Sequence, residues 1–135
     1  MKSILKAAVL FLTLAMALSC NKDNSSSGSL SGTWAVNSKM GNSPNPTEAQ
    51  ELVSNLGYIV FSGNTVTFRG DNNEELAKGT YSITIPENSQ DSSHGMISFS
   101  GVPLKGGEFT RVVTSNLETM SWHDIDDILI SIKKL

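Results

Sequence analysis

The sequence predicts an all-β domain: an eight-stranded antiparallel up-and-down barrel with one short helix between the first and second strands. About eight short segments with apolar or alternating residues follow one another after Leu30. Most are joined by short turns rich in Gly, Asn and Asp, and one early segment carries a helical pattern instead. Short, evenly spaced strands form either a barrel or a β-sandwich, so the sandwich is the alternative fold.

The clearest strand is 65–69, where Val66 and Phe68 share one face and threonines occupy the other. This two-residue period is typical of a half-buried strand. The last two strands are expected to form a hairpin across the polar segment 123–127. In chain order, the expected strands are 33–39, 58–61, 65–69, 76–85, 96–100, 109–115, 117–122 and 128–135.

The expected helix begins near Asn45, which can cap it, with Pro46 in the first turn. Glu48 lies three residues after Asn45, as in a capping box, and Gly57 is placed to end the helix. Four apolar residues recur at helical spacing and form one face of this helix: Ala49, Leu52, Val53 and Leu56.

The first twenty residues have the pattern of a secretory signal. Lys2 and Lys6 lie just before the apolar run 7–18, and Ser19-Cys20 follows that run. The run is too short to span a bilayer, which needs about 20 apolar residues. The small residue followed by cysteine resembles the lipobox of bacterial lipoproteins, although Leu18 sits one place later than usual. The resemblance implies cleavage before Cys20 and attachment of lipid to its thiol.

The chain is therefore expected to have three parts. Residues 1–19 form the signal peptide, residues 20–29 are the lipidated Cys20 and a flexible Ser/Gly tether, and residues 30–135 form the barrel domain. Cys20 is the only cysteine, so no intrachain disulfide can form. The expected location is the outer membrane, lipid-anchored, with the periplasmic face and the cell surface both open.

The charge balance excludes some partners. Removal of Lys2 and Lys6 leaves 8 basic residues against 13 acidic ones. An acidic chain with two arginines does not fit nucleic-acid binding. It also has no basic patch in its sequence for anionic headgroups, so membrane contact is expected through the lipid anchor alone.

A family resemblance begins at Leu30-Ser31-Gly32-Thr33-Trp34. A Gly-x-Trp sequence opening the first strand of an eight-stranded meander resembles the lipocalin, or calycin, group, and more closely its small bacterial lipoproteins. The resemblance implies that Trp34 packs at the closed end of the barrel under a basic residue of the last strand. Here Lys133 or Lys134 would replace the usual arginine.

The resemblance also implies a binding function for a small hydrophobic ligand, with interior residues lining the site. Alternation combined with the assumed barrel gives the candidates Trp34, Val66, Phe68, Tyr81, Ile83 and Phe99. Tyr58 is added because its hydroxyl, like that of Tyr81, could orient a ligand head group. Leu52, Val53 and Leu56 of the helix could form a lid over the open mouth. Alternatively, they simply fill the barrel end as core.

No catalytic constellation is recognisable, so the protein is not expected to be an enzyme. His94 lies in an expected polar connection without a nucleophile elbow. His123, Asp124, Asp126 and Asp127 could approach a metal, but aspartates are also favoured in turns for their own hydrogen bonds. We expect no metal and no cofactor.

Two functions remain open from the sequence. The first is a lipid-anchored protein that binds a small hydrophobic ligand inside the barrel. The second is a surface interaction module with a solid barrel, whose loops bind a protein or glycan partner of unknown identity.

Overall fold

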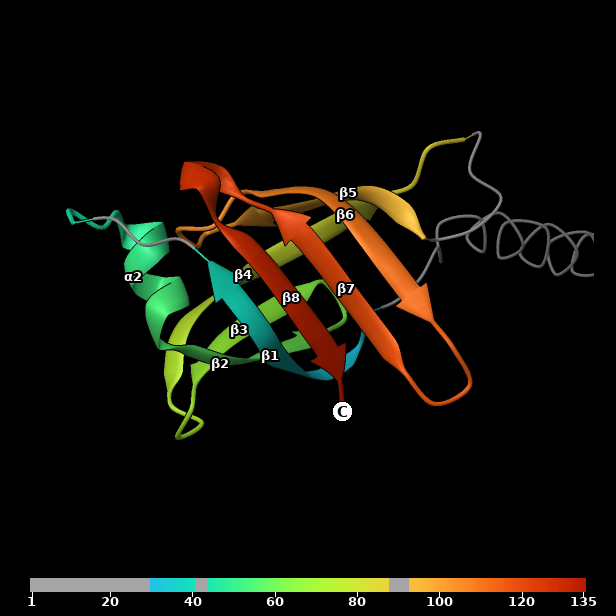
Figure 1. The fold of residues 1–135 in the computed structure, drawn as a ribbon, viewed down its shortest axis with the longest axis horizontal. Helices are drawn as coiled ribbons and strands as arrows, with labels where there is room; N and C mark the ends of the chain where they lie inside the picture. The colour runs from blue at the N-terminus through green and yellow to red at the C-terminus, as the bar shows by residue number, and fades with distance from the viewer. Residues whose placement is uncertain (1–29, 41–43, 88–92) are drawn as a thin grey trace, which may run out of the picture.

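The computed structural model describes residues 30–40, 44–87 and 93–135, so Cys20 and the expected signal and tether lie outside the described residues. The described chain forms one closed antiparallel barrel of eight strands in sequence order (Figure 1). The elements are β1 (Gly32–Met40), α2 (Glu48–Asn55), β2 (Leu56–Ser62), β3 (Thr65–Gly70), β4 (Glu75–Thr84), β5 (His94–Ser100), β6 (Gly106–Val113), β7 (Glu118–His123), η2 (Ile125–Asp127) and β8 (Leu129–Lys134).

Pairing of the first and last strands closes the ring. β1 pairs with β2 along one edge and with β8 along the other, so Trp34 lies between Ile59 and Lys134. This closure confirms the predicted barrel with one helix between β1 and β2, and it excludes the β-sandwich. A closed ring leaves no free strand edge, which removes the usual route to edge-to-edge aggregation.

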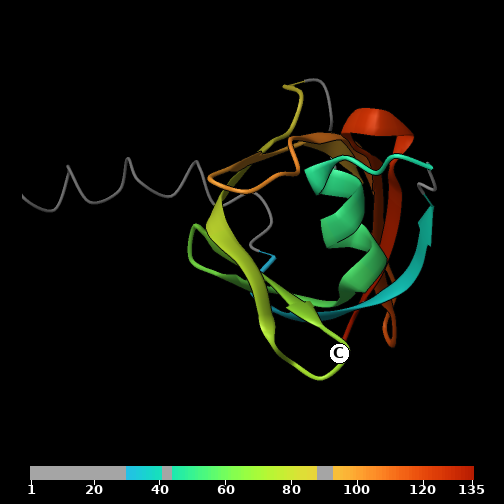
Figure 2. The same cartoon turned by 90° about the vertical axis from the view of Figure 1, so that its left-hand side faces the viewer.

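The barrel has two distinct ends. The helix end carries α2 and the connections 71–74, 101–105 and 124–128, whereas the N-terminal end carries Leu30 and the 114–117 turn. Seen from the helix end, α2 lies across the mouth of the ring of strands (Figure 2).

The helix begins two residues later than predicted. Thr47 is the N-cap: its Oγ1 accepts from the Gln50 backbone N–H at 3.3 Å, and the Thr47 N–H donates to Gln50 Oε1 at 3.1 Å. Thr47 and Gln50 thus form the capping box that was expected from Asn45 and Glu48. Gly57 does not end the helix, because the chain turns at the extended C-cap Leu56 and enters β2 at once.

Several strands are longer than their apolar patterns indicate. β5 begins at His94, which therefore belongs to a strand and not to a polar connection. β6 begins at Gly106 and ends at Val113, two residues short of the expected 115. A Cβ on Gly107 would lie 1.9 Å from the His123 carbonyl oxygen, so the close approach of β6 to β7 requires glycine there.

Candidate functional site

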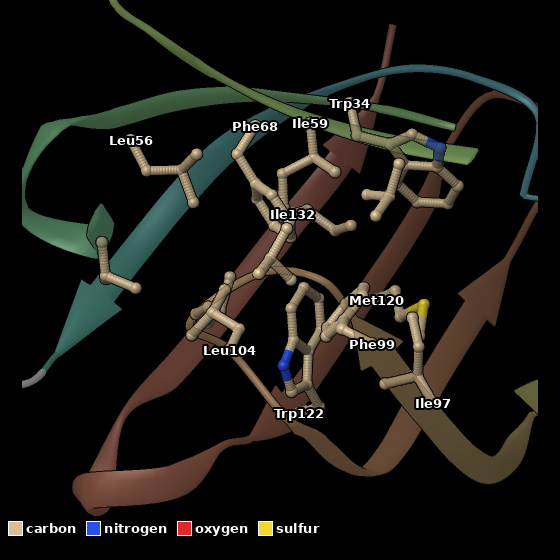
Figure 3. Packing of buried hydrophobic residues seen from close by; sticks show 14 of the residues in the cluster. Trp34, Leu56, Ile59, Phe68, Ile97, Phe99, Leu104, Met120, Trp122 and Ile132 are labelled. Atoms are coloured by element: carbon tan, nitrogen blue, oxygen red, sulfur yellow. The ribbon is translucent and has the colours of Figure 1, made fainter. Parts of the chain in front are cut away.

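The barrel interior holds most of the residues predicted to line a ligand site. Trp34, Val66, Phe68 and Phe99 are buried in a single hydrophobic cluster inside the barrel. Figure 3 shows Trp34, Phe68 and Phe99 in this cluster. Tyr81 and Ile83 are partly buried and pack against the same cluster. These six side chains therefore come together, as members of a packed core.

Tyr58 is the exception, because the structure places its side chain outside this core. From Tyr58 onward along β2 the buried side chains are Ile59 and Phe61, with Tyr58 and Val60 half-buried in the alternate positions. Tyr58 pairs with Ala35 on β1 and Arg69 on β3, and it is not part of the core cluster. A strand places successive side chains on opposite faces, so Tyr58 faces outward.

Several interior residues were missed as candidates by the sequence reasoning. Ile59 and Phe61 lie in a run with Tyr58 and Val60 in which every residue is apolar or aromatic, so periodicity could not separate the faces. The other missed core residues lie in the later strands and the 101–105 connection: Ile97, Val102, Leu104, Phe109, Met120, Trp122 and Ile132.

Aromatic rings fill the interior in two groups. Toward the N-terminal end, Phe61 contacts Trp34 and Tyr81 edge to face, with centroids 6.3 and 4.7 Å apart. Toward the helix end, Phe99 lies 5.5 Å from Phe68 and 5.8 Å from Trp122. Aromatic pairs in this geometry contribute about 0.5–1.5 kcal/mol each beyond their buried area.

The apolar face of α2 completes this core. Leu52, Val53 and Leu56 are 8%, 3% and 1% exposed, and they belong to the same cluster as the interior aromatics. All three residues expected in a lid therefore pack down into the barrel mouth, which α2 covers (Figure 2). Their burial also meets the need of an amphipathic helix to cover its apolar face.

Polar contacts hold α2 at both of its ends. At its start, the Thr47 hydroxyl donates to Asp126 Oδ2 at 2.8 Å and Gln50 Nε2 donates to the Asp126 carbonyl at 3.3 Å. At its end, Lys39 Nζ donates to the carbonyls of Ser54 and Leu56 at 2.8 and 3.0 Å. A lysine in this position satisfies carbonyls left open at a helix C-terminus.

Asp124 connects three segments of the helix end. Its Oδ1 accepts from the backbone N–H groups of Lys105 and Ile125 at 2.9 and 2.8 Å. Its Oδ2 accepts from the Gly106 N–H at 2.9 Å and from Trp122 Nε1 at 3.0 Å. This carboxylate therefore fastens the 101–105 connection to the β7–β8 turn.

Two surface grooves flank α2 at the helix end. One, of about 590 Å³, has apolar walls from Ala49, Val102, Pro103 and Ile125. The other, of about 370 Å³, adjoins the first and shares Glu48 and Pro103 with it. The first groove is also lined by Thr47, Glu48, Gly101, Lys105 and Asp126. The second groove is lined by Glu48, Glu51, Leu52, Asn55, Leu76, Ala77 and Pro103.

Acidic residues are concentrated around these grooves. In the described part of the chain, eight acidic and three basic residues lie in or beside the connections of the helix end. The acidic residues are Glu48, Glu51, Asp71, Glu74, Glu75, Asp124, Asp126 and Asp127, and the basic ones are Lys39, Arg69 and Lys105. This end of the barrel therefore presents a net negative potential.

The N-terminal end is organised around Trp34. Its Nε1 donates to the Leu30 carbonyl at 2.8 Å, and Lys134 Nζ lies 5.8 Å from the centroid of its ring. Lys134, and not Lys133, is thus the basic residue over the tryptophan. Lys134 Nζ also lies 3.6 Å from Glu118 Oε2, and Glu118 pairs with Arg111.

Burial raises the pKa of the nearby Tyr81, against an opposing backbone hydrogen bond with Leu30.

Both histidines are exposed on the outer wall of the barrel. Both His94 and His123 border a hollow of about 450 Å³ across β5 and β6, together with Glu108 and Met96. His94 Nδ1 lies 2.7 Å from Ser93 Oγ. Within the described ranges, no group of three His, Cys, Asp or Glu residues could hold a metal ion.

Comparisons with protein-family models, with curated proteins and with solved structures found no match to this chain. Among the residues described by the structure, none of the helices has the length and apolar character needed to cross a membrane.

Proposed function

We propose that this chain is a lipid-anchored cell-envelope protein whose barrel is a solid scaffold, and that its helix end binds a protein partner with a basic surface. The observation that carries the proposal is the single buried cluster joining the interior aromatics to the apolar face of α2. A barrel of eight strands is just wide enough for its own side chains to fill it. The binding surface then has to lie outside.

Two features of the helix end support a protein partner. The groove beside Pro103 combines apolar walls with acidic residues such as Glu48 and Asp126, the mixture found where an apolar anchor is surrounded by polar contacts. The excess of acidic residues there would favour a basic partner and speed its association at low salt. The anchor itself remains a proposal from the signal-like pattern before Cys20.

Site-specific photo-crosslinking in the native host tests this function. A benzoylphenylalanine in place of Glu51, beside the second groove, should give a discrete cross-linked product. The same residue in place of Ser82, exposed on β4, should not. The Glu48→Gln/Glu75→Gln pair should reduce the yield, and the Glu87→Gln/Glu108→Gln pair should leave it unchanged. Equal products from both positions, or no response to either charge change, would contradict the proposal.

A second candidate function is uptake of a small hydrophobic ligand inside the barrel. It is favoured by the place of α2 across the mouth, where polar contacts from Lys39 and Asp126 hold the helix ends. Ligand entry would require α2 to lift and the core to rearrange. Titration with a fluorescent fatty acid tests this: saturable binding that Tyr81→Trp abolishes would support it, and no uptake by the unaltered protein would exclude it.

A further inference from the structure

We propose that the N-terminal end of the barrel rests on the surface of the membrane that holds the anchor, through an apolar rim flanked by lysines. This inference rests on the lipid anchor of the proposed function, and it adds an orientation: the acidic helix end points away from the bilayer.

The rim is formed by consecutive strands. Of the seven large apolar side chains that are exposed in the described part of the chain, four lie here: Val112, Val113, Leu117 and Leu135. Val113 pairs with Glu118 next to Leu117, and β7 pairs with β8, whose end precedes Leu135. Val112 and Val113 end β6, Leu117 lies in the turn before β7, and Leu135 follows β8, so the four residues lie at one edge of the ring.

Exposure at this edge is substantial. Val113 is 60% exposed and Leu117 is 39% exposed, although the barrel interior buries other valines and leucines completely. Within the turn, the Thr114 backbone N–H donates to the Leu117 carbonyl at 2.7 Å, so the turn is held in a defined shape. Apolar side chains on a fixed turn can enter the interfacial region of a bilayer without first paying to order the backbone.

The charges at this end suit an anionic lipid surface. Lys133 is exposed beside the rim and Lys134 lies next to it, 32% exposed, whereas Arg111 is 10% exposed and pairs with Glu118. Among the described residues of this end, these three basic residues face two acidic ones, Glu87 and Glu118. Juxtamembrane lysines attract anionic headgroups, whereas the acidic helix end would be repelled. The sequence, read alone, indicated no basic patch because these residues are separated along the chain.

The place where the tether begins gives the same orientation. Leu30 is fully buried at the N-terminal end, where Trp34 holds its carbonyl. Nine residues separate Cys20 from Leu30, and the ten Cα-to-Cα steps set a reach of about 35 Å when fully extended. The strands of the barrel are about 20–30 Å long. Bringing the helix end to the bilayer would therefore require a nearly stretched tether, at a large entropic cost.

Fluorescence quenching on vesicles tests the orientation. The full chain, lipidated in a bacterial host, would be reconstituted into vesicles of phosphatidylethanolamine and phosphatidylglycerol that contain nitroxide-labelled lipid. A fluorophore would be attached to a new thiol at Leu117→Cys, or at Ile125→Cys on the helix end. The two parent residues are 39% and 43% exposed, so they form a matched pair. Val113→Cys provides a second position on the rim.

The expected result is quenching about twofold or more stronger at the rim positions than at Ile125→Cys. Lys133→Glu should reduce this difference, and Lys78→Glu on the barrel wall should not. Equal quenching at both ends, in protein that sediments with the vesicles, would overturn the orientation and leave the anchor intact. Protein that stays in solution would overturn both the anchor and the orientation.

Discussion

The indole Nε1 of Trp122 donates a hydrogen bond to Oδ2 of Asp124 at 3.0 Å. Trp122 belongs to the filled interior, and Asp124 also binds backbone N–H groups of Lys105 and Gly106. The packing of the core and the position of the 101–105 connection are therefore linked by one carboxylate. Because Val102 and Pro103 of this connection line the groove beside α2, the shape of the proposed binding surface depends on the same contact.

Replacing Asp124 should therefore destabilise the protein more than replacing a neighbouring aspartate. In Asp124→Asn an amide group would face backbone and indole donors, so we expect a loss of about 2 kcal/mol in the free energy of unfolding. Asp127→Asn is the matched control, because asparagine tolerates the positive φ of 57° at this position. Urea denaturation measures the free energy of unfolding of both variants. Equal losses would contradict a stabilising role for the four hydrogen bonds of Asp124.

Lys39→Met should loosen α2 locally. The substitution keeps the length of the side chain and removes the ammonium that binds the Ser54 and Leu56 carbonyls. We expect a loss of about 1 kcal/mol and faster amide hydrogen exchange in α2, with β5 to β7 unchanged. Lys78→Met, at an exposed position of β4, is the control. Unaltered exchange in α2 would mean that its apolar face alone holds it.

Tyr81 should make the protein less stable at alkaline pH. Burial raises the pKa of Tyr81 above its ordinary value of 10.0 in the folded state. Above about pH 10 the unfolded chain then loses the phenol proton while the folded chain keeps it, so the free energy of unfolding falls as pH rises. Tyr81→Phe should flatten this decline, measured by urea denaturation between about pH 9 and pH 11. Tyr58→Phe, on the outer face, is the comparison, and parallel declines in wild type and Tyr81→Phe would contradict the assignment.

Lys134 and Lys133 should differ in their contribution to stability despite being neighbours. Lys134 lies over the Trp34 ring and near Glu118, whereas Lys133 is exposed on the outer face. Lys134→Met should cost about 0.5–1 kcal/mol and Lys133→Met less, because a partly desolvated cation over an indole is stabilising. Thermal denaturation at low salt compares the two, and a larger cost for Lys133→Met would refute the role of Lys134.

The sequence predicted the barrel because local patterns agreed with its topology. Alternation in β3 and the tight turns are local features, and closure of the ring follows from eight such strands. The helix was also predicted, with its cap at the first of two possible positions, Asn45, whereas the structure uses the second, Thr47. The second is used because Thr47 also bonds to Asp126, 79 residues away.

The site was harder to predict because its contacts are distant in sequence. In the run around Tyr58 every side chain is apolar or aromatic, so only the register with β1 and β3 shows which side chains face inward. The role of Asp124 depends on N–H groups 18 and 19 residues away. An aspartate in a polar turn gives no sign of such partners.

Native mass spectrometry of the full, lipidated chain, purified in detergent, tests the central claim that the interior is filled by the protein itself. We predict one mass, that of the chain with its acyl modification, and no uptake from a panel of fatty acids, sterol-like compounds and porphyrins. A reproducible additional mass, lost under gentle activation and abolished by Tyr81→Trp, would contradict the claim and identify the barrel as a ligand-binding site.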